Sequence, residues 1–185
     1  MSFQEELRSF CPYNVQEQED QRIMLDFLAR YPELLFSRTS FAHFTVSAWI
    51  VNASRTRVLL IFHNIYQSWS WSGGHVPDSD DLIGFTVNKA RQETNLQSVH
   101  PALDQIYSLE IVATNGYYHD DKYSPAHLHL NLTYLLEADE MEPIYTNEAE
   151  SGGVKWFDLR RAAMLSNGTW IRSIYSKLNA KLESL

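Results

Sequence analysis

The stretch from residue 73 to residue 96, GGHVPDSDDLIGFTVNKARQETNL, constrains the fold more than any other part of the chain. Its two adjacent glycines, Gly73 and Gly74, let the backbone approach a ligand closely. The acidic segment DSDD that follows favours the start of a helix, because Asp and Ser cap helices and acidic groups suit the helix N-terminus. The sequence therefore predicts a glycine loop and then a helix over residues 80–94.

One face of this predicted helix carries Lys89, Gln92 and Glu93, since positions i, i+3 and i+4 lie side by side on a helix. Three carboxylates there would bind Mg²⁺, a hard cation that takes oxygen ligands and the oxygens of a diphosphate. This chain has one carboxylate of the three, at Glu93, and Lys89 lies one turn before it. The face is therefore either a metal site at Glu93 or a solvated surface with one ion pair.

Size and charge set the broad class. A chain of 185 residues with 44% hydrophobic and 21% charged residues suits one soluble globular domain. No apolar run approaches the roughly 18 residues that span a bilayer, and the N-terminus lacks a secretory signal. A single cysteine, Cys11, excludes an intramolecular disulfide, and the formal charge of −8 argues against broad nucleic-acid binding. We therefore expect a cytoplasmic protein that binds neither membrane nor nucleic acid.

Hydrophobic periodicity predicts alternating helices and strands. The helices are expected over residues 17–31, 80–94, 159–165 and 171–182. The strands are expected over residues 41–51, 58–63, 107–114, 127–136 and 154–157, with loops over residues 64–76 and 115–126. Strands mixed with helices indicate a layered α/β domain.

The glycine-and-helix stretch resembles a Nudix box, which reads Gly, five residues, Glu, seven residues, then Arg-Glu-(apolar)-x-Glu-Glu-x-Gly-(apolar). The leading Gly is Gly74. The later positions of the box hold Asp80, Asn88, Lys89, Ala90, Gln92, Glu93, Asn95 and Leu96. The segments AHFTVSAWIVN, HNIYQSWSWSGGH, HLHLNLTYLLEADE and SGGVKWFDL look like a group of bacterial Nudix proteins of unassigned substrate.

This resemblance implies a Nudix-type α/β/α sandwich with a mixed sheet and extra helices at both ends. Residues 41–165 would form the Nudix domain, residues 1–40 an N-terminal helical extension, and residues 166–185 a C-terminal helix packed on the domain. The whole would be a single domain. The terminal helices would cap it or form a homodimer contact.

The resemblance also implies a chemistry. In Nudix enzymes, box glutamates bind divalent metal and water attacks a diphosphate linkage. That role carries over to Glu93, as a Mg²⁺ or Mn²⁺ ligand, and less directly to Gln92 and Asp80. Glu148 or Glu150 lies where some members place a further catalytic acid, although both could be ordinary loop carboxylates.

Four of the seven histidines fall in positions that suggest a second metal site. His127 and His129 are two apart on a predicted strand and so point to one face, while His43 begins another strand and His75 follows the glycines. Imidazoles suit Zn²⁺ or another transition metal. The arrangement resembles isopentenyl diphosphate isomerase, which binds metal through residues at these places, but the isomerase cysteine is replaced by Gly73. The alternative is that the histidines contact phosphate or base through hydrogen bonds.

Further residues are candidates for substrate binding. Gly73 and Gly74 would approach the substrate, and Trp69 and Trp71 would stack on a base, unless they pack in the core. His63 ends its strand beside the glycine loop. Tyr118 lies in the long loop over residues 115–126, a candidate lid or a mobile surface loop.

Three functions follow from these observations. The first is a metal-dependent Nudix-type hydrolase of a nucleoside diphosphate linked to another group. The second is a non-catalytic Nudix domain that binds a nucleotide or metabolite. The third is a different chemistry, such as isomerisation, at a histidine-bound metal.

Overall fold

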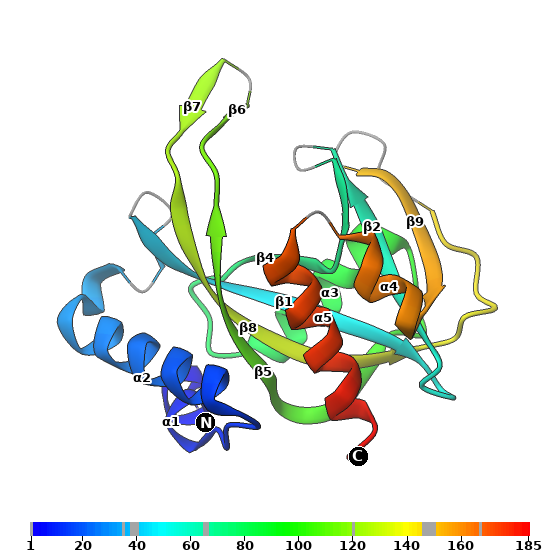
Figure 1. The fold of residues 1–185 in the computed structure, drawn as a ribbon, viewed down its shortest axis with the longest axis horizontal. Coiled ribbons are helices and arrows are strands. Elements are labelled where there is room, and N and C mark those ends of the chain that lie inside the picture. The colour runs from blue at the N-terminus through cyan, green and yellow to red at the C-terminus, as the bar shows by residue number, and fades with distance from the viewer. Residues whose placement is uncertain are drawn as a thin grey trace.

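The structure, a computed structural model, describes residues 2–34, 36–37, 41–64, 67–119, 121–145, 151–166 and 168–185. A mixed sheet forms its centre, with helices on both sides (Figure 1). The sheet runs in the order β3 (Ser68–Ser70), β2 (Arg57–His63), β1 (Ala42–Asn52), β8 (His127–Ala138) and β5 (His100–Thr114). Two further strands, β4 (Ser72–His75) and β9 (Ser151–Asp158), pair with β1 and β2 respectively. The expected α/β architecture is confirmed.

Strand β1 organises the sheet because it is buried along its whole length. It runs parallel to β8, whereas the other strand pairings within the described ranges are antiparallel. In this register His43 faces His129 across the parallel pair, and Thr45 faces His75 of β4. The histidines of three strands thus meet at one end of the sheet.

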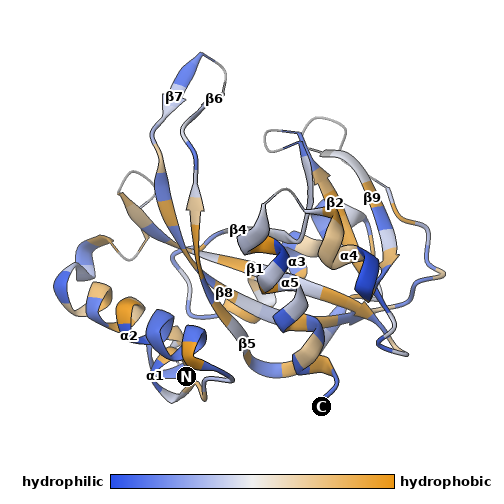
Figure 2. Cartoon of the chain, viewed as in Figure 1, coloured by the Kyte–Doolittle hydropathy of each residue, from blue (hydrophilic) through white to orange (hydrophobic). Residues whose placement is uncertain are grey.

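The two faces of β1 enter two separate cores, because successive side chains on a strand point in opposite directions. Phe44, Val46 and Ile50 pack with α1 (Phe3–Ser9), α2 (Val15–Arg30) and α3 (Leu82–Thr94). Trp49 and Val51 pack with α4 (Leu159–Leu165) and α5 (Thr169–Leu182). Figure 2 shows hydrophobic colour along the central strands. The terminal helices therefore cover the same sheet as the central helix.

Helix α2 also covers the open edge of β5. Gln16 donates to the carbonyl of Leu109 at 2.9 Å, and Asp20 accepts from the backbone N–H of Ile111 at 2.9 Å. An uncovered edge strand leaves backbone groups available to other chains. These side-chain bonds satisfy part of that edge.

Two loop predictions were wrong. The segment over residues 64–76 contains β3 and β4, which were expected to be loop. The segment over residues 115–126 contains the hairpin of β6 (Tyr117–His119) and β7 (Lys122–Ser124), which projects from the sheet as an arm (Figure 1). Strand β5 begins at His100 and not at residue 107, and helix α1 was not predicted.

The box helix is confirmed with a shifted start. Asp81 is its N-cap and accepts a hydrogen bond from Gly84 N–H at 2.8 Å. It ends at Asn95, whose φ of 62° is left-handed. The Nudix pattern has glycine there, and asparagine tolerates this conformation better than most residues. None of the helices in the described ranges is both long and apolar enough to cross a lipid bilayer.

Candidate functional site

The structure brings four histidines together at one end of the sheet. His43 of β1 is buried and lies in the middle, with its ring centroid 4.7 Å from that of His75, 4.8 Å from His127 and 4.9 Å from His129. Nitrogen atoms of His43, His75 and His129 all lie within 4.8 Å of one another. We call these four residues the histidine cluster.

Hydrogen bonds orient the outer member of the histidine cluster. The Nδ1 of His127 lies 2.8 Å from the carbonyl oxygen of Pro125. A carbonyl can only accept, so this ring nitrogen carries the proton. The other nitrogen, Nε2, then faces Nε2 of His129 at 3.0 Å. The carbonyl of Pro125 thus directs an imidazole nitrogen into the cluster.

The surroundings of His129 disfavour its protonated form. Burial, with smaller contributions from the neighbouring His43, His127 and His75, lowers the pKa of His129 to about 3. A neutral imidazole has a lone pair for a metal, whereas a protonated one has none. Three imidazole nitrogens from separate strands match the donor set of catalytic zinc sites, which use three protein ligands and an open position. The donor set suits Zn²⁺ or another transition metal better than Mg²⁺.

The box helix offers a different arrangement. Lys89 Nζ lies 2.8 Å from Glu93 Oε1, and Ser72 Oγ of β4 donates to Glu93 Oε2 at 2.6 Å. Both carboxylate oxygens of Glu93 are thereby engaged. Gln92 is exposed one residue earlier on the helix. The ion pair considered from the sequence is present, and a divalent ion at Glu93 would have to displace Lys89.

A row of polar side chains continues from the histidine cluster along the same face of the sheet. Thr45 donates to the side-chain oxygen of Asn131 at 3.0 Å, and Asn131 donates to Glu110 at 3.0 Å. Ser47 and Thr133 lie 3.0 Å apart in the next pair. We did not single out this row from the sequence. Its signal is the repetition of polar residues at every second position in both strands.

The other predicted site residues lie beside the second core, at the end of β2 and on the arm of β6 and β7. Trp69 packs on Phe157 with ring centroids 4.8 Å apart, and Trp71 packs on Tyr175 at 5.3 Å, so both adjoin the second core. His63 pairs with Ser68 at the end of β2. Tyr118 is 75% exposed on the arm, where it contacts Tyr123.

Three predicted carboxylates remain. Glu148 and Glu150 lie outside the described residues. Asp80 is exposed just before α3, whose N-cap is the next residue, Asp81. The role expected of these three carboxylates stays a prediction.

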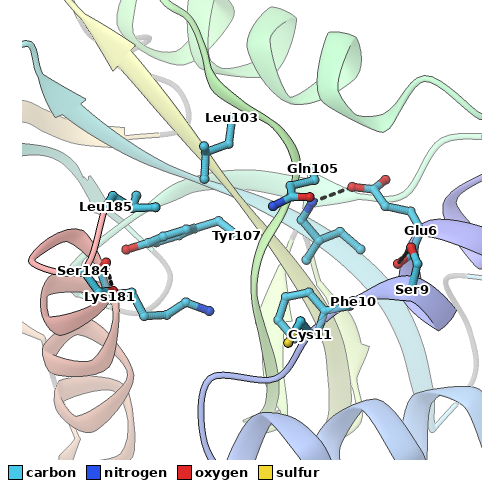
Figure 3. A pocket seen from close by; sticks show the side chains of 11 residues that line it. Glu6, Ser9, Phe10, Cys11, Leu103, Gln105, Tyr107, Lys181, Ser184 and Leu185 are labelled. Atoms are coloured by element: carbon cyan, nitrogen blue, oxygen red, sulfur yellow. Dashed lines mark hydrogen bonds between the residues drawn. The ribbon is translucent and has the colours of Figure 1, made fainter.

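A small pocket of about 210 Å³ lies elsewhere, between α1, β5 and α5 (Figure 3). Lys181 extends into it toward Phe10, Cys11 and Tyr107. Its ammonium is bound by Glu17 at 2.9 Å and lies over the rings of Phe10 and Tyr107. This lysine is therefore committed to the packing of α5, and the pocket shares no lining residue with the histidine cluster.

Comparison with known proteins gives a structural likeness. No family model matches the chain, and no curated protein sequence is significantly similar to it. The structure resembles a C. elegans Ap4A hydrolase, at 16% identity and a TM-score of 0.56, over 77% of this chain and 98% of that chain. It also resembles RenU, a Nudix hydrolase from M. smegmatis, at 14% identity and a TM-score of 0.54, over 77% and 87% of the two chains. A third likeness is to a hydrolase of the Nudix family from Clostridium perfringens, at 18% identity and a TM-score of 0.51, over 75% and 97%.

Proposed function

From the Nudix fold of this chain and the histidine cluster on its sheet, we propose a metal-dependent hydrolase. Its substrate would be a small molecule in which a nucleoside diphosphate is linked to another group. The catalytic metal would be held by His43, His75 and His129. The likeness to an Ap4A hydrolase and to other Nudix hydrolases supports this reaction class.

The observation that carries the proposal is the convergence of nitrogens from three strands within 4.8 Å. Imidazoles that merely bind substrate need no such mutual proximity, and crowding them costs solvation of each ring. A divalent transition metal bound there would act as a Lewis acid and supply activated water. His127, held by the carbonyl of Pro125, would orient a fourth nitrogen toward the same centre.

Other residues would complete the site. The short strand β4 joins the histidine cluster to the box helix, because it carries His75 at one end and Ser72, the partner of Glu93, at the other. Glu93, Gln92 and Glu150 remain proposed catalytic groups, and Mg²⁺ or Mn²⁺ at Glu93 remains the competing metal assignment. Gly73, Gly74, His63, Trp69, Trp71 and Tyr118 remain proposed substrate contacts.

Metal analysis tests the assignment to the histidines. Chelator-treated protein reloaded with Zn²⁺ should retain close to one equivalent after desalting. His75→Gln should weaken Zn²⁺ affinity by at least about 100-fold, since even outer partners of metal ligands contribute 10- to 100-fold. His100→Gln, which changes an exposed histidine of β5, is the matched control and should bind as the unchanged protein does. Equal Zn²⁺ binding by both variants would exclude the cluster as the metal site.

Turnover tests the reaction. The reloaded protein is incubated with nucleotide sugars, dinucleotides including Ap4A, and nucleoside triphosphates, each with Zn²⁺, Mn²⁺ or Mg²⁺. We expect release of a nucleoside monophosphate or diphosphate that is lost in His75→Gln. Turnover that needs Mg²⁺ and disappears in Glu93→Gln, but not in His75→Gln, would assign the catalytic metal to the box helix.

The ion pair between Lys89 and Glu93 favours a second candidate, a domain that binds a nucleotide without cleaving it. A ligand that binds the native state raises its melting temperature by mass action. A compound that stabilises the protein and is recovered intact, with every metal tested, would support this binding function. Cleavage of each stabilising compound would exclude it.

A further inference from the structure

We propose that His127 does not bind the metal itself but positions the metal ligand His129, by accepting a hydrogen bond from its ring. This inference rests on the proposed function in taking the metal to be held by His43, His75 and His129. It gives the fourth member of the histidine cluster a role of its own. The metal then has three protein ligands and keeps an open position for water or substrate.

A backbone carbonyl determines which ring nitrogen of His127 bears the hydrogen. Nδ1 of His127 lies 2.8 Å from the carbonyl oxygen of Pro125, which can only accept, so Nδ1 is the donor. A neutral imidazole has one N–H and one lone pair, so the lone pair of neutral His127 is on Nε2. Pro125 lies in the short link between β7 and β8. The base of the arm therefore fixes this tautomer.

The lone pair of His127 faces the ring of His129. Nε2 of His127 lies 3.0 Å from Nε2 of His129, which is a hydrogen-bonding distance. Because the nitrogen of His127 carries the lone pair, the nitrogen of His129 must carry the hydrogen and donate it; otherwise two lone pairs would face each other. The lone pair of His129 is therefore on its other nitrogen, Nδ1.

Nδ1 of His129 is available to a metal. It makes no hydrogen bond within the described chain, since the ring of His129 bonds to His127 through Nε2. Among the described residues, the imidazoles whose nitrogens lie within 4.8 Å of one another are those of His43, His75 and His129, and His127 is not in this group. The position of His127 therefore suits the partner of a ligand better than a fourth ligand.

A hydrogen-bond acceptor behind a metal-binding histidine has a known physical effect. A ligating imidazole almost always donates its second N–H to an acceptor, which fixes the orientation of the ring and raises its basicity. Here the acceptor is an imidazole that a carbonyl holds in turn. The ring of His127 also stacks on that of His43, with centroids 4.8 Å apart and an interplanar angle of 30°. His129 is therefore held in place before metal binds, which lowers the cost of binding.

Nitrogen-15 NMR of the histidine rings tests the assignment directly. A ring nitrogen that bears hydrogen, one with a lone pair and one bound to metal differ in chemical shift, and single histidine variants assign the signals. In the Zn²⁺-loaded protein we expect metal at Nδ1 of His129 and hydrogen at its Nε2. His127 should bear hydrogen at Nδ1 and a lone pair at Nε2, with no metal at either nitrogen. A metal-bound nitrogen in His127, or metal at Nε2 of His129, would overturn the inference.

Zn²⁺ affinity, measured by competition with a chelator, gives a second readout. His127→Leu removes the acceptor and should weaken binding by about 10- to 100-fold, the usual effect of losing an outer partner of a metal ligand, while each chain still binds one Zn²⁺. His127→Gln should recover part of this loss, because its amide oxygen can accept the same N–H. Unchanged affinity in His127→Leu, or equal losses in the two variants, would contradict a positioning role.

The matched control is His100→Leu. Nδ1 of His100 lies 2.9 Å from the carbonyl oxygen of Ser98, so this ring also bonds to the residue two positions before it, but His100 is exposed and lies outside the histidine cluster. The control should bind Zn²⁺ as the unchanged protein does. Thermal unfolding of each variant establishes that it is folded.

These outcomes are separate from those of the hydrolase assay. Turnover that is lost in His75→Gln, together with a metal-bound nitrogen in His127, would leave the proposed function standing and remove the positioning role. Zn²⁺ binding and ring signals that follow the expectations above, without turnover of any substrate, would keep the role of His127 and remove the hydrolase.

Discussion

At the scale of single residues, the two adjacent glycines of β4 have different reasons to be glycine. A Cβ on Gly73 would lie 2.5 Å from the carbonyl oxygen of Val46 and 3.1 Å from Ser47 Cα, both of which belong to the β1 backbone. Backbone atoms in the middle of a sheet cannot move aside as a flexible side chain can. Gly73 is therefore needed for β4 to pair with β1, whereas Gly74 is not.

We expect Gly73→Ala to lower the free energy of unfolding by about 1–3 kcal/mol, the usual cost of overpacking. Gly74→Ala should change it by no more than about 0.5 kcal/mol, as a surface substitution does. Urea unfolding at pH 7 measures both. Equal stability of the two variants would contradict the close approach of β4 to β1.

Residue types and spacing predicted part of this region. The i, i+4 spacing of Lys89 and Glu93 indicated their ion pair, and the alternation in β8 indicated that His127 and His129 share a face. The hydrogen bond from Ser72 to Glu93 could not be predicted from the sequence, because it joins residues 21 positions apart and depends on how β4 packs against α3. Whether the four histidines meet also depends on strand order, which periodicity within each strand does not contain.

At the scale of elements, a buried ionic network joins α2, β5 and α5. The Glu17 side chain is fully buried, accepts from Ser108 Oγ at 2.6 Å and lies 2.9 Å from Lys181 Nζ. Lys177 lies 3.1 Å from both Glu17 and Glu110. Burial would raise the pKa of Glu17, but the charge of Lys177 and the hydrogen bonds from Ser108, Lys181 and Tyr13 outweigh it and lower the pKa.

The lowered pKa of Glu17 has a defined effect on stability. Its contribution is complete above the ordinary value of 4.5 and is lost as the pH falls through the lower value of the folded state. Burial raises the pKa of Glu6 and Asp20 instead, so protonation of these two carboxylates at low pH favours the folded state. We expect the stability of the unchanged protein to fall below pH 4.5, by an amount to which Glu17 contributes.

Glu17→Gln tests this network. It leaves two buried lysines with one carboxylate, Glu110, so we expect a loss of about 3–5 kcal/mol at pH 7, as for other broken buried ion pairs. The loss relative to the unchanged protein should shrink as the pH falls below 4.5 and through the lowered pKa of Glu17, because protonated Glu17 is also neutral. The control is Glu19→Gln, which changes an exposed carboxylate on the same helix. Similar unfolding curves for the two variants at pH 7 would show that the network contributes nothing.

The arm formed by β6 and β7 was wrongly predicted to be a loop from its local sequence. Residues 115–126 include Gly, Asp and Pro, which are typical of loops. The pairing of Tyr117 with Ser124 nevertheless continues the ladder in which Thr114 pairs with His127. The register of the long β5–β8 hairpin therefore extends into a segment whose own sequence favours a loop.

We expect deletion of residues 117–123 to leave the fold intact, because Tyr118 and Tyr123 are exposed and contact each other. The deletion retains Pro125, whose carbonyl orients His127. The melting temperature should stay within about 4 °C of the unchanged protein, equivalent to roughly 1 kcal/mol, and Zn²⁺ binding should persist. If Tyr118 belongs to a substrate lid, KM rises while metal binding does not change. Loss of cooperative unfolding would show instead that the arm is part of the core.

At the scale of the whole molecule, the sheet is stable only when both of its faces are covered. The face with Phe44 and Val46 is covered by α1, α2 and α3, and the face with Trp49 and Val51 by α4 and α5. Periodicity predicted most of these helices, but it did not show that α2 and α5 join through Glu17 and its two lysines. The terminal helices are therefore expected to fold together with the sheet.

The last prediction concerns residues 41–165 expressed alone. This fragment corresponds to the Nudix domain expected from the sequence, and it lacks Met24, Tyr175 and Leu178, which are buried against the sheet in the full chain. Exposing those contact surfaces should remove cooperative unfolding, whereas the full chain should unfold in one transition with coincident far-UV and tryptophan signals. Circular dichroism and fluorescence during heating measure this. A fragment that melts cooperatively near the temperature of the full chain would instead make the terminal helices accessories to an independent domain.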